Sequence, residues 1–213
     1  MPDTPSTARS VKIGADERTG WSSDRPRREG APPRPVDVST RCRVLRPSDR
    51  MRYSPGSLLL VVSASAADRD RFIDRVIEEK GAVFSLGKIR RLVEGRVPAD
   101  ELDQRAGELQ QAAVAKRLEA GESVVIGAEG LDAQERDRWV RLAHAQRRPR
   151  HIILLETSKE QVGEDDAAPL NDLRTALDAG ELGAEGFQTA MRLGGAAIGE
   201  LKRIVFRPAP RED

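Results

Sequence analysis

The feature that most constrains the fold is the stretch "SLLLVVSASAADRDRFIDRV", residues 57–76. Leu58–Val62 is apolar without alternation, which is typical of a strand that is covered on both faces. The segment that follows, Ala66–Lys80, carries its apolar residues on one face of a helix. A buried strand that runs directly into an amphipathic helix predicts a parallel α/β fold with right-handed crossovers.

The same alternation of short apolar runs and amphipathic segments continues along the chain. Besides Ser57–Ser63 and Ala66–Lys80, we expect strands at Ala82–Ser85, Ser123–Gly127, His151–Glu156 and Arg203–Arg207, and helices at Ala99–Ala120 and Asp132–Arg147. These segments predict a parallel five-stranded sheet flanked by helices.

The amino-terminal part has a different composition from the rest. Residues 1–42 hold six of the 13 prolines and lack apolar periodicity, so we expect a disordered Pro/Arg-rich tail followed by one domain at 43–213. Within that domain, residues 156–187 hold nine acids against two bases, an acidic lid-like segment that is typical of a solvated loop. The carboxyl-terminal part, 184–213, predicts no more than a helix and a last strand.

Composition excludes several classes of function. The formal net charge of +1 gives no whole-molecule attraction to nucleic acid or to an anionic membrane. One cysteine and two histidines permit neither an internal disulfide nor a zinc cage. The apolar runs are too short to span a membrane, and the amino terminus lacks a signal-peptide core. We therefore expect a cytoplasmic protein without a membrane partner.

A phosphate-binding loop, G-x-x-x-x-G-K-[ST], is commonly found where a strand runs into a helix. When Ser63 is set on the first glycine, Arg69 takes the position of the lysine and Asp70 that of the hydroxyl that holds Mg²⁺. Ser65 is also a good N-cap, with Asp68 three residues later as in a capping box. The residues alone leave open whether this is a nucleotide site, the remains of one, or only a corner between a strand and a helix.

Three further stretches extend the pattern. They are "FSLGKIRRLV" (84–93), "KRLEAGESVVIGAEGLDAQERDRWVRLA" (116–143) and "RHIILLETSKEQV" (150–162). In this order, over residues 44–162, the chain resembles the kinase domain of bacterial and phage polynucleotide kinases. Members of that family are P-loop phosphotransferases that move the γ-phosphate of ATP to a 5′-hydroxyl end of RNA or DNA.

The resemblance assigns roles to a few positions. The family motif S-x-D-x-x-R, whose aspartate is the general base and whose arginine holds the acceptor phosphate, falls on Ser85–Arg90, so that Gly87 takes the base position and Arg90 keeps the arginine. The family's "VVDATN"-like run is "VVIGAEG" here, with Gly127 and Gly130 at the Asp and Asn positions, and Arg136 keeps the arginine of the next helix. The segment that supplies a lid arginine in the family is the acidic one in this chain.

These losses predict a degenerate, catalytically inactive polynucleotide-kinase-like domain that binds a phosphate, a nucleic-acid 5′ end or a protein. We expect no catalytic residue, metal or cofactor. The candidate ligand-binding residues are Ser63, Ser65, Arg69, Asp70, Arg90 and Arg136.

Two alternatives remain open at this point. One is an active, divergent kinase that uses ATP and Mg²⁺, with Asp70 on the metal. The other is a purely structural module that recruits a protein partner through the acidic segment or the tail.

Overall fold

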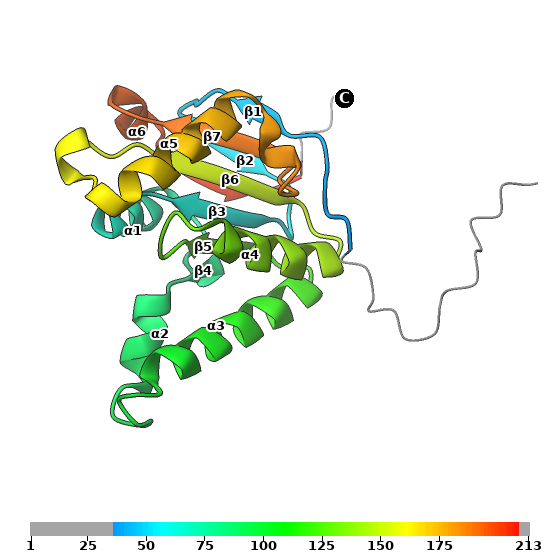
Figure 1. Cartoon of the computed structure of the whole chain (residues 1–213). Helices are drawn as coiled ribbons and strands as arrows, with labels where there is room; N and C mark the ends of the chain where they lie inside the picture. Colours follow the sequence, from blue (N-terminus) through cyan, green and yellow to red (C-terminus); the bar gives the residue numbers. More distant parts are fainter. Residues whose placement is uncertain (1–35, 209–213) are drawn as a thin grey trace, which may run out of the picture. The chain divides into compact units, whose positions relative to one another are not determined.

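The computed structural model describes residues 36–208, except for the side chain of Lys159. Two parallel sheets are present in this part of the chain (Figure 1). The larger sheet has six strands in the order β1-β7-β6-β3-β5-β4, and the smaller one pairs β2 with β8. The strands of the large sheet are β1 (Arg43–Leu45), β3 (Leu58–Val62), β4 (Val83–Phe84), β5 (Val124–Gly127), β6 (Arg150–Leu155) and β7 (Thr189–Leu193). The small sheet consists of β2 (Arg50–Tyr53) and β8 (Arg203–Phe206).

This topology confirms the parallel α/β class and corrects the number of strands. Four of the five expected strands are β3, β4, β5 and β6 of the large sheet. The fifth, β8, pairs with β2 instead, so its place in a five-stranded sheet was wrong. The strands β1, β2 and β7 were not expected, because each is three to five residues long and contains at least one arginine.

Helices cover both faces of the large sheet. They are α1 (Ala66–Val76), α2 (Leu86–Val93), α3 (Leu102–Glu119), α4 (Ala133–Ala145), α5 (Glu164–Asp178) and α6 (Ala196–Glu200). Alternate residues of β3 point to opposite faces: Leu58 and Leu60 join the core beneath α3, α4 and α5, whereas Leu59 and Val61 join the core beneath α1 and the small sheet. No helix in the described part of the chain is long and apolar enough to cross a membrane.

The acidic segment contains a packed helix, α5, and is not the solvated loop that we expected. Leu170, Leu173 and Leu177 of α5 are buried in the core that this helix shares with α4. The acids Glu164, Asp165 and Asp166 lie in the first turn of α5, where the helix dipole favours negative charge. Five of the nine acids therefore lie on a packed helix.

The packed chain also begins earlier than residue 43. Val38 is buried and belongs to the same core as α4, and the backbone N–H of Thr40 donates to the Gly183 carbonyl at 2.8 Å. Residues 1–35 of the expected tail lie outside the described residues.

The helices α2 and α3 pack against each other and extend away from the sheet beyond β4 (Figure 1). None of the residues of α2 is buried. Gln110 of α3 ties this pair to the sheet, because its buried amide donates to the Phe84 carbonyl at the end of β4.

Candidate functional site

The candidate site lies where the parallel strands β3, β4, β5 and β6 end. Ligands of open α/β sheets bind outside the carboxyl ends of the strands, near the point where the connections change direction. Here the connection that follows β3 leads toward one edge of the sheet, to β4, and the connection that follows β6 leads toward the opposite edge, to β7. The residues that follow these strands are therefore the candidates for a binding site.

The connection from β3 to α1 is a three-residue corner, Ser63 to Ser65. The side chain of Ser65 accepts the backbone N–H of Asp68 at 3.3 Å, which confirms the N-cap. In a capping box, the side chain three residues after the N-cap accepts the N–H of the N-cap residue. Here the Ser63 hydroxyl accepts the N–H of Ser65 instead, and it also pairs with the Thr157 hydroxyl at 3.0 Å. Both serines thus hold the corner together.

This corner does not fit Mg²⁺-ATP in the manner of a phosphate loop. Such a loop wraps several residues around the phosphates before its helix begins, and its glycines let backbone N–H groups converge on them. Here the residue that follows Ser65 is already helical, so most of the aligned loop residues, including Arg69 and Asp70, belong to the helix. Asp68 and Asp70 stand on either side of Arg69. Their carboxylates would repel the negative charge of a triphosphate at this corner.

Arg69 lies across the end of β5. Its side chain donates to the Ala128 carbonyl, and it pairs with Asp70 at 2.8 Å and with Glu129 at 3.7 Å. The residue is only 4% exposed. A Cβ on Gly127 would lie 2.6 Å from the Arg69 Nε, so Gly127 is what leaves room for this side chain.

Arg90 reaches the same carboxylate from α2. Its Nε donates to Asp103 of α3 at 2.7 Å, and its Nη1 donates to Glu129 at 3.1 Å. Burial alone would lower the pKa of Arg90, but the hydrogen bonds to Asp103 and Glu129 outweigh it and raise the pKa. The structure therefore brings together Arg69 and Arg90, two of the predicted residues, through Glu129, which was not predicted.

The structure does not bring Arg136 to this place. Arg136 belongs to α4 and packs on the other face of the sheet from α1, where it is buried. Its Nε and Nη2 each donate to Glu185 at 2.8 Å, and its Nη1 donates to the Leu131 carbonyl at 2.6 Å. Arg136 lines a separate groove between α4 and α5.

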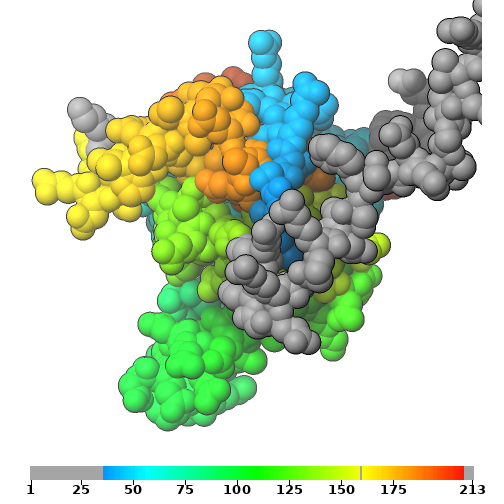
Figure 2. Space-filling model, turned by 45° about the vertical axis from the view of Figure 1, so that its right-hand side comes forward, coloured from blue at the N-terminus to red at the C-terminus, as the bar shows by residue number. Residues whose placement is uncertain are grey.

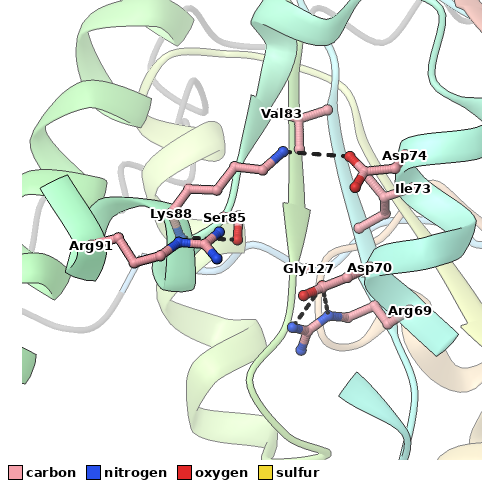
Figure 3. A pocket seen from close by; sticks show the side chains of 9 residues that line it. All are labelled: Arg69, Asp70, Ile73, Asp74, Val83, Ser85, Lys88, Arg91 and Gly127. Atoms are coloured by element: carbon pink, nitrogen blue, oxygen red, sulfur yellow. Dashed lines mark hydrogen bonds and ion pairs between the residues drawn. The ribbon is translucent and has the colours of Figure 1, made fainter. Parts of the chain in front are cut away.

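A small cleft of about 100 Å³ opens beside Arg69 (Figure 3). It lies among α1, β4 and α2, and it is lined by Arg69, Asp70, Ile73, Asp74, Val83, Ser85, Lys88, Arg91 and Gly127. Lys88 pairs with Asp74 at 3.4 Å across the cleft. Among the residues described, Arg91 has no hydrogen-bond or ion-pair partner. Gly87, at the family's base position, is exposed in the first turn of α2.

The acidic segment supplies one arginine near this edge, and that arginine is paired. Arg174 of α5 donates to Glu156, which follows β6, and Arg192 of β7 donates to the same carboxylate. Burial would raise the pKa of Glu156, but the two arginines outweigh it and lower the pKa. The contact fastens α5 to the sheet.

Asp70 has no set of neighbours suited to a metal ion. Its carboxylate accepts from the Nε of Arg69 at 2.9 Å. Within residues 36–208, no group of three or more His, Cys, Asp or Glu side chains is placed to hold a metal ion.

The fold is that of a parallel α/β domain with helices on both faces of its larger sheet. Residues 59–171, just over half of the chain, match the family model described as an AAA domain, and the chain belongs to that family. Among solved structures, the chain is similar to a protein described as a "putative kinase" from Chloroflexus aurantiacus J-10-fl. The identity is 14%, the match covers 68% of this chain and 87% of that one, and the TM-score is 0.41. No curated protein matches.

Proposed function

We propose that the chain is a catalytically inactive relative of the polynucleotide kinases that binds a phosphate monoester, such as a nucleic-acid 5′ end, at the carboxyl edge of its sheet. The observation that carries the proposal is the convergence of Arg69 and Arg90 on one carboxylate beside a corner that has no phosphate-wrapping loop. Two guanidinium groups that share one carboxylate are spaced to share one phosphate.

The case against phosphoryl transfer rests on several positions at once. Catalysis by P-loop enzymes depends on positioning and on charge around the phosphates and the metal. The cation in the lysine position, Arg69, already holds a carbonyl and two carboxylates. A glycine, Gly87, stands where the family has its base, and Asp70 faces Arg69.

The case for binding rests on the cations near the corner. Lys88 and Arg91 line the cleft beside Arg69, and Arg90 stands on the same helix as both. Arginine matches a phosphate through paired N–H donors, and lysine adds a point charge. The edge therefore offers four cationic side chains from two helices.

The test compares two oligonucleotides that differ only in a 5′-phosphate or a 5′-hydroxyl. We expect the full chain to bind the phosphorylated one more tightly and to form no phosphorylated product from the other in the presence of Mg²⁺-ATP. Arg90→Gln should weaken binding, whereas Arg105→Gln, an exposed arginine of α3 with its own carboxylate partners, should not. Equal affinity for the two ends would contradict the binding proposal.

The same experiment addresses the active alternative. A divergent kinase would bind ATP only with Mg²⁺ and would phosphorylate the 5′-hydroxyl oligonucleotide. Turnover that is lost in both Arg69→Ala and Asp70→Ala would replace our proposal with that one. An ATP-induced rise in melting temperature that requires Mg²⁺ would support it.

A second candidate function, recruitment of a basic protein segment, is favoured by the groove between α4 and α5. This groove has a volume of about 500 Å³ and an apolar floor that includes Leu173 and Ala176. Asp132, Asp166 and Asp172 line it, against the single, paired Arg136. Binding of an arginine-rich peptide that is lost when these three acids become asparagine would support this function.

A further inference from the structure

The side chain of Glu129 occupies the point where the two candidate phosphate-binding arginines meet. We infer that the Glu129 carboxylate occupies the position that the phosphate takes when it binds. It competes with weakly binding anions for the two arginines until a phosphate monoester displaces it. This inference rests on the proposed binding function and adds the means by which the site is regulated.

The contacts of Glu129 are the longest in the cluster. Its Oε1 lies 3.7 Å from the Arg69 Nη2, and its Oε2 lies 3.1 Å from the Arg90 Nη1. Its side chain is 38% exposed and that of Arg90 is 35% exposed. Ion pairs between partly exposed groups contribute little to stability, so the contact with Arg90 can be exchanged at small cost.

Each arginine keeps another anchor when Glu129 leaves. Arg69 retains Asp70 and the Ala128 carbonyl, and Arg90 retains Asp103. Neither guanidinium is therefore left buried without a partner, which is the situation that makes the removal of an ion-pair partner costly. Among the residues described, Glu129 is the one carboxylate that both arginines share.

The backbone at Glu129 does not need to move. Its N–H donates to both oxygens of the Glu135 carboxylate at 3.1 Å, and the N–H of Gly130 donates to the same group at 3.3 Å. Glu135 thus fixes the loop after β5 while the Glu129 side chain is free to rotate toward solvent. Displacement then needs only a change of rotamer.

The charge of the cluster explains why a phosphate monoester is the expected ligand. With Lys88 and Arg91 of the adjoining cleft included, the four cations are balanced by Asp70, Asp74, Asp103 and Glu129, so the edge offers an anion no net attraction. When Glu129 turns away, one excess positive charge remains. A monoester carries up to two negative charges and three acceptor oxygens, so it replaces a carboxylate better than a phosphodiester does.

The test uses Glu129→Gln, which removes the charge and keeps the shape, in the full chain. Inorganic phosphate and a short 5′-phosphorylated oligonucleotide are titrated by calorimetry at low, constant ionic strength. We expect Glu129→Gln to bind both at least about tenfold more tightly than the unaltered chain. Glu108→Gln, an equal change of charge on an exposed residue of α3, should change either affinity less than about twofold.

Three results separate the possible failures. If the unaltered chain prefers the 5′-phosphate but Glu129→Gln binds no more tightly, the binding function stands and the role of Glu129 is wrong. If neither protein binds phosphate at millimolar concentration, the binding function itself fails. A gain that persists in Glu129→Gln/Arg90→Gln would also overturn the inference, because it would not depend on the shared arginine. Unfolding midpoints of all variants check that the site remains folded.

Discussion

At the scale of single residues, Arg69 and Gly127 form one packing unit although the sequence places them 58 positions apart. In the sequence, Arg69 stands in the lysine position and Gly127 in the family's aspartate position. That the glycine provides the space that the arginine fills depends on how α1 lies against β5, which the sequence alone does not show. The two residues are therefore better understood as one packing unit.

A double-mutant cycle tests this unit. Gly127→Ala should destabilise the chain by about 1–3 kcal/mol, since the new methyl group would push the buried Arg69 from its hydrogen bonds. In an Arg69→Ala background the same change should cost clearly less, with a coupling energy of about 1 kcal/mol or more in urea unfolding. Gly107→Ala in α3, where a Cβ meets nothing within 4 Å, should be neutral or stabilising. Additive effects at 69 and 127 would contradict the pairing.

His151 gives a prediction about pH. It is buried at the start of β6, where its Nδ1 lies 2.8 Å from the Thr189 hydroxyl and its ring lies 4.5 Å from that of Tyr53. Burial, with a smaller contribution from Arg150, lowers its pKa from 6.5 to about 4. The unfolded chain therefore binds the proton more readily, and stability is lost as pH falls from about 6.5 toward 4.

Between pH 7 and pH 5 we expect this group alone to remove about 2 kcal/mol from the free energy of unfolding. His151→Gln should flatten that part of the pH profile, measured by urea unfolding at fixed ionic strength. The window stops at pH 5 because carboxylates contribute below it. An unchanged slope in His151→Gln would show that other groups cause the loss.

At the scale of elements, the sequence predicted the strands and helices near the centre of the domain and failed at its edges. The apolar runs of β3, β5 and β6 are buried along their whole length, so their pattern is unambiguous. The helix α5 was not predicted because its many acids indicated a solvated loop, although Leu170, Leu173 and Leu177 have helical spacing. Net charge describes the exposed face of a helix and says little about whether another face is buried.

The contact of α5 with the sheet can be tested at Glu156. Glu156→Gln removes the charge that Arg174 and Arg192 share, and the side chain of Glu156 is only 16% exposed. We expect a loss of about 1–2 kcal/mol in urea unfolding, since charge-assisted hydrogen bonds at a partly buried site are lost. Asp137→Asn, which breaks an exposed pair in α4, should cost no more than about 0.5 kcal/mol. Equal losses would mean that the Glu156 contact is no stronger than a surface pair.

At the scale of the whole molecule, the class of fold followed from alternation, but the order of the strands did not. The pairing of β2 with β8 joins residues about 150 positions apart, and neither strand carries a local signal for its partner (Figure 1). The space-filling view shows α5 and the segment at 36–45 on one face of the molecule (Figure 2). Pairing between strands so far apart in the sequence depends on how the elements pack. Composition and periodicity do not predict which of these strands will pair.

The beginning of the packed domain is the last feature to test. Val38 contributes to the core beside Val140, and the backbone of residues 38–42 lies so close to Gly183 and Gly186 that a Cβ at either glycine would collide with it. A chain that starts at residue 36 and one that starts at residue 43 therefore differ by a piece of the core.

We expect the chain that starts at residue 43 to be less stable than the one that starts at 36 by about 2 kcal/mol or more, the value of one buried valine with its neighbouring hydrogen bond. Urea unfolding of both truncated chains measures the difference. Val38→Ala in the full chain should lose about 1–2 kcal/mol, whereas the exposed Val44→Ala should lose less than about 0.5 kcal/mol. Equal midpoints for the two truncated chains would place the boundary at residue 43, because residues 36–42 would then contribute nothing to the core that they touch.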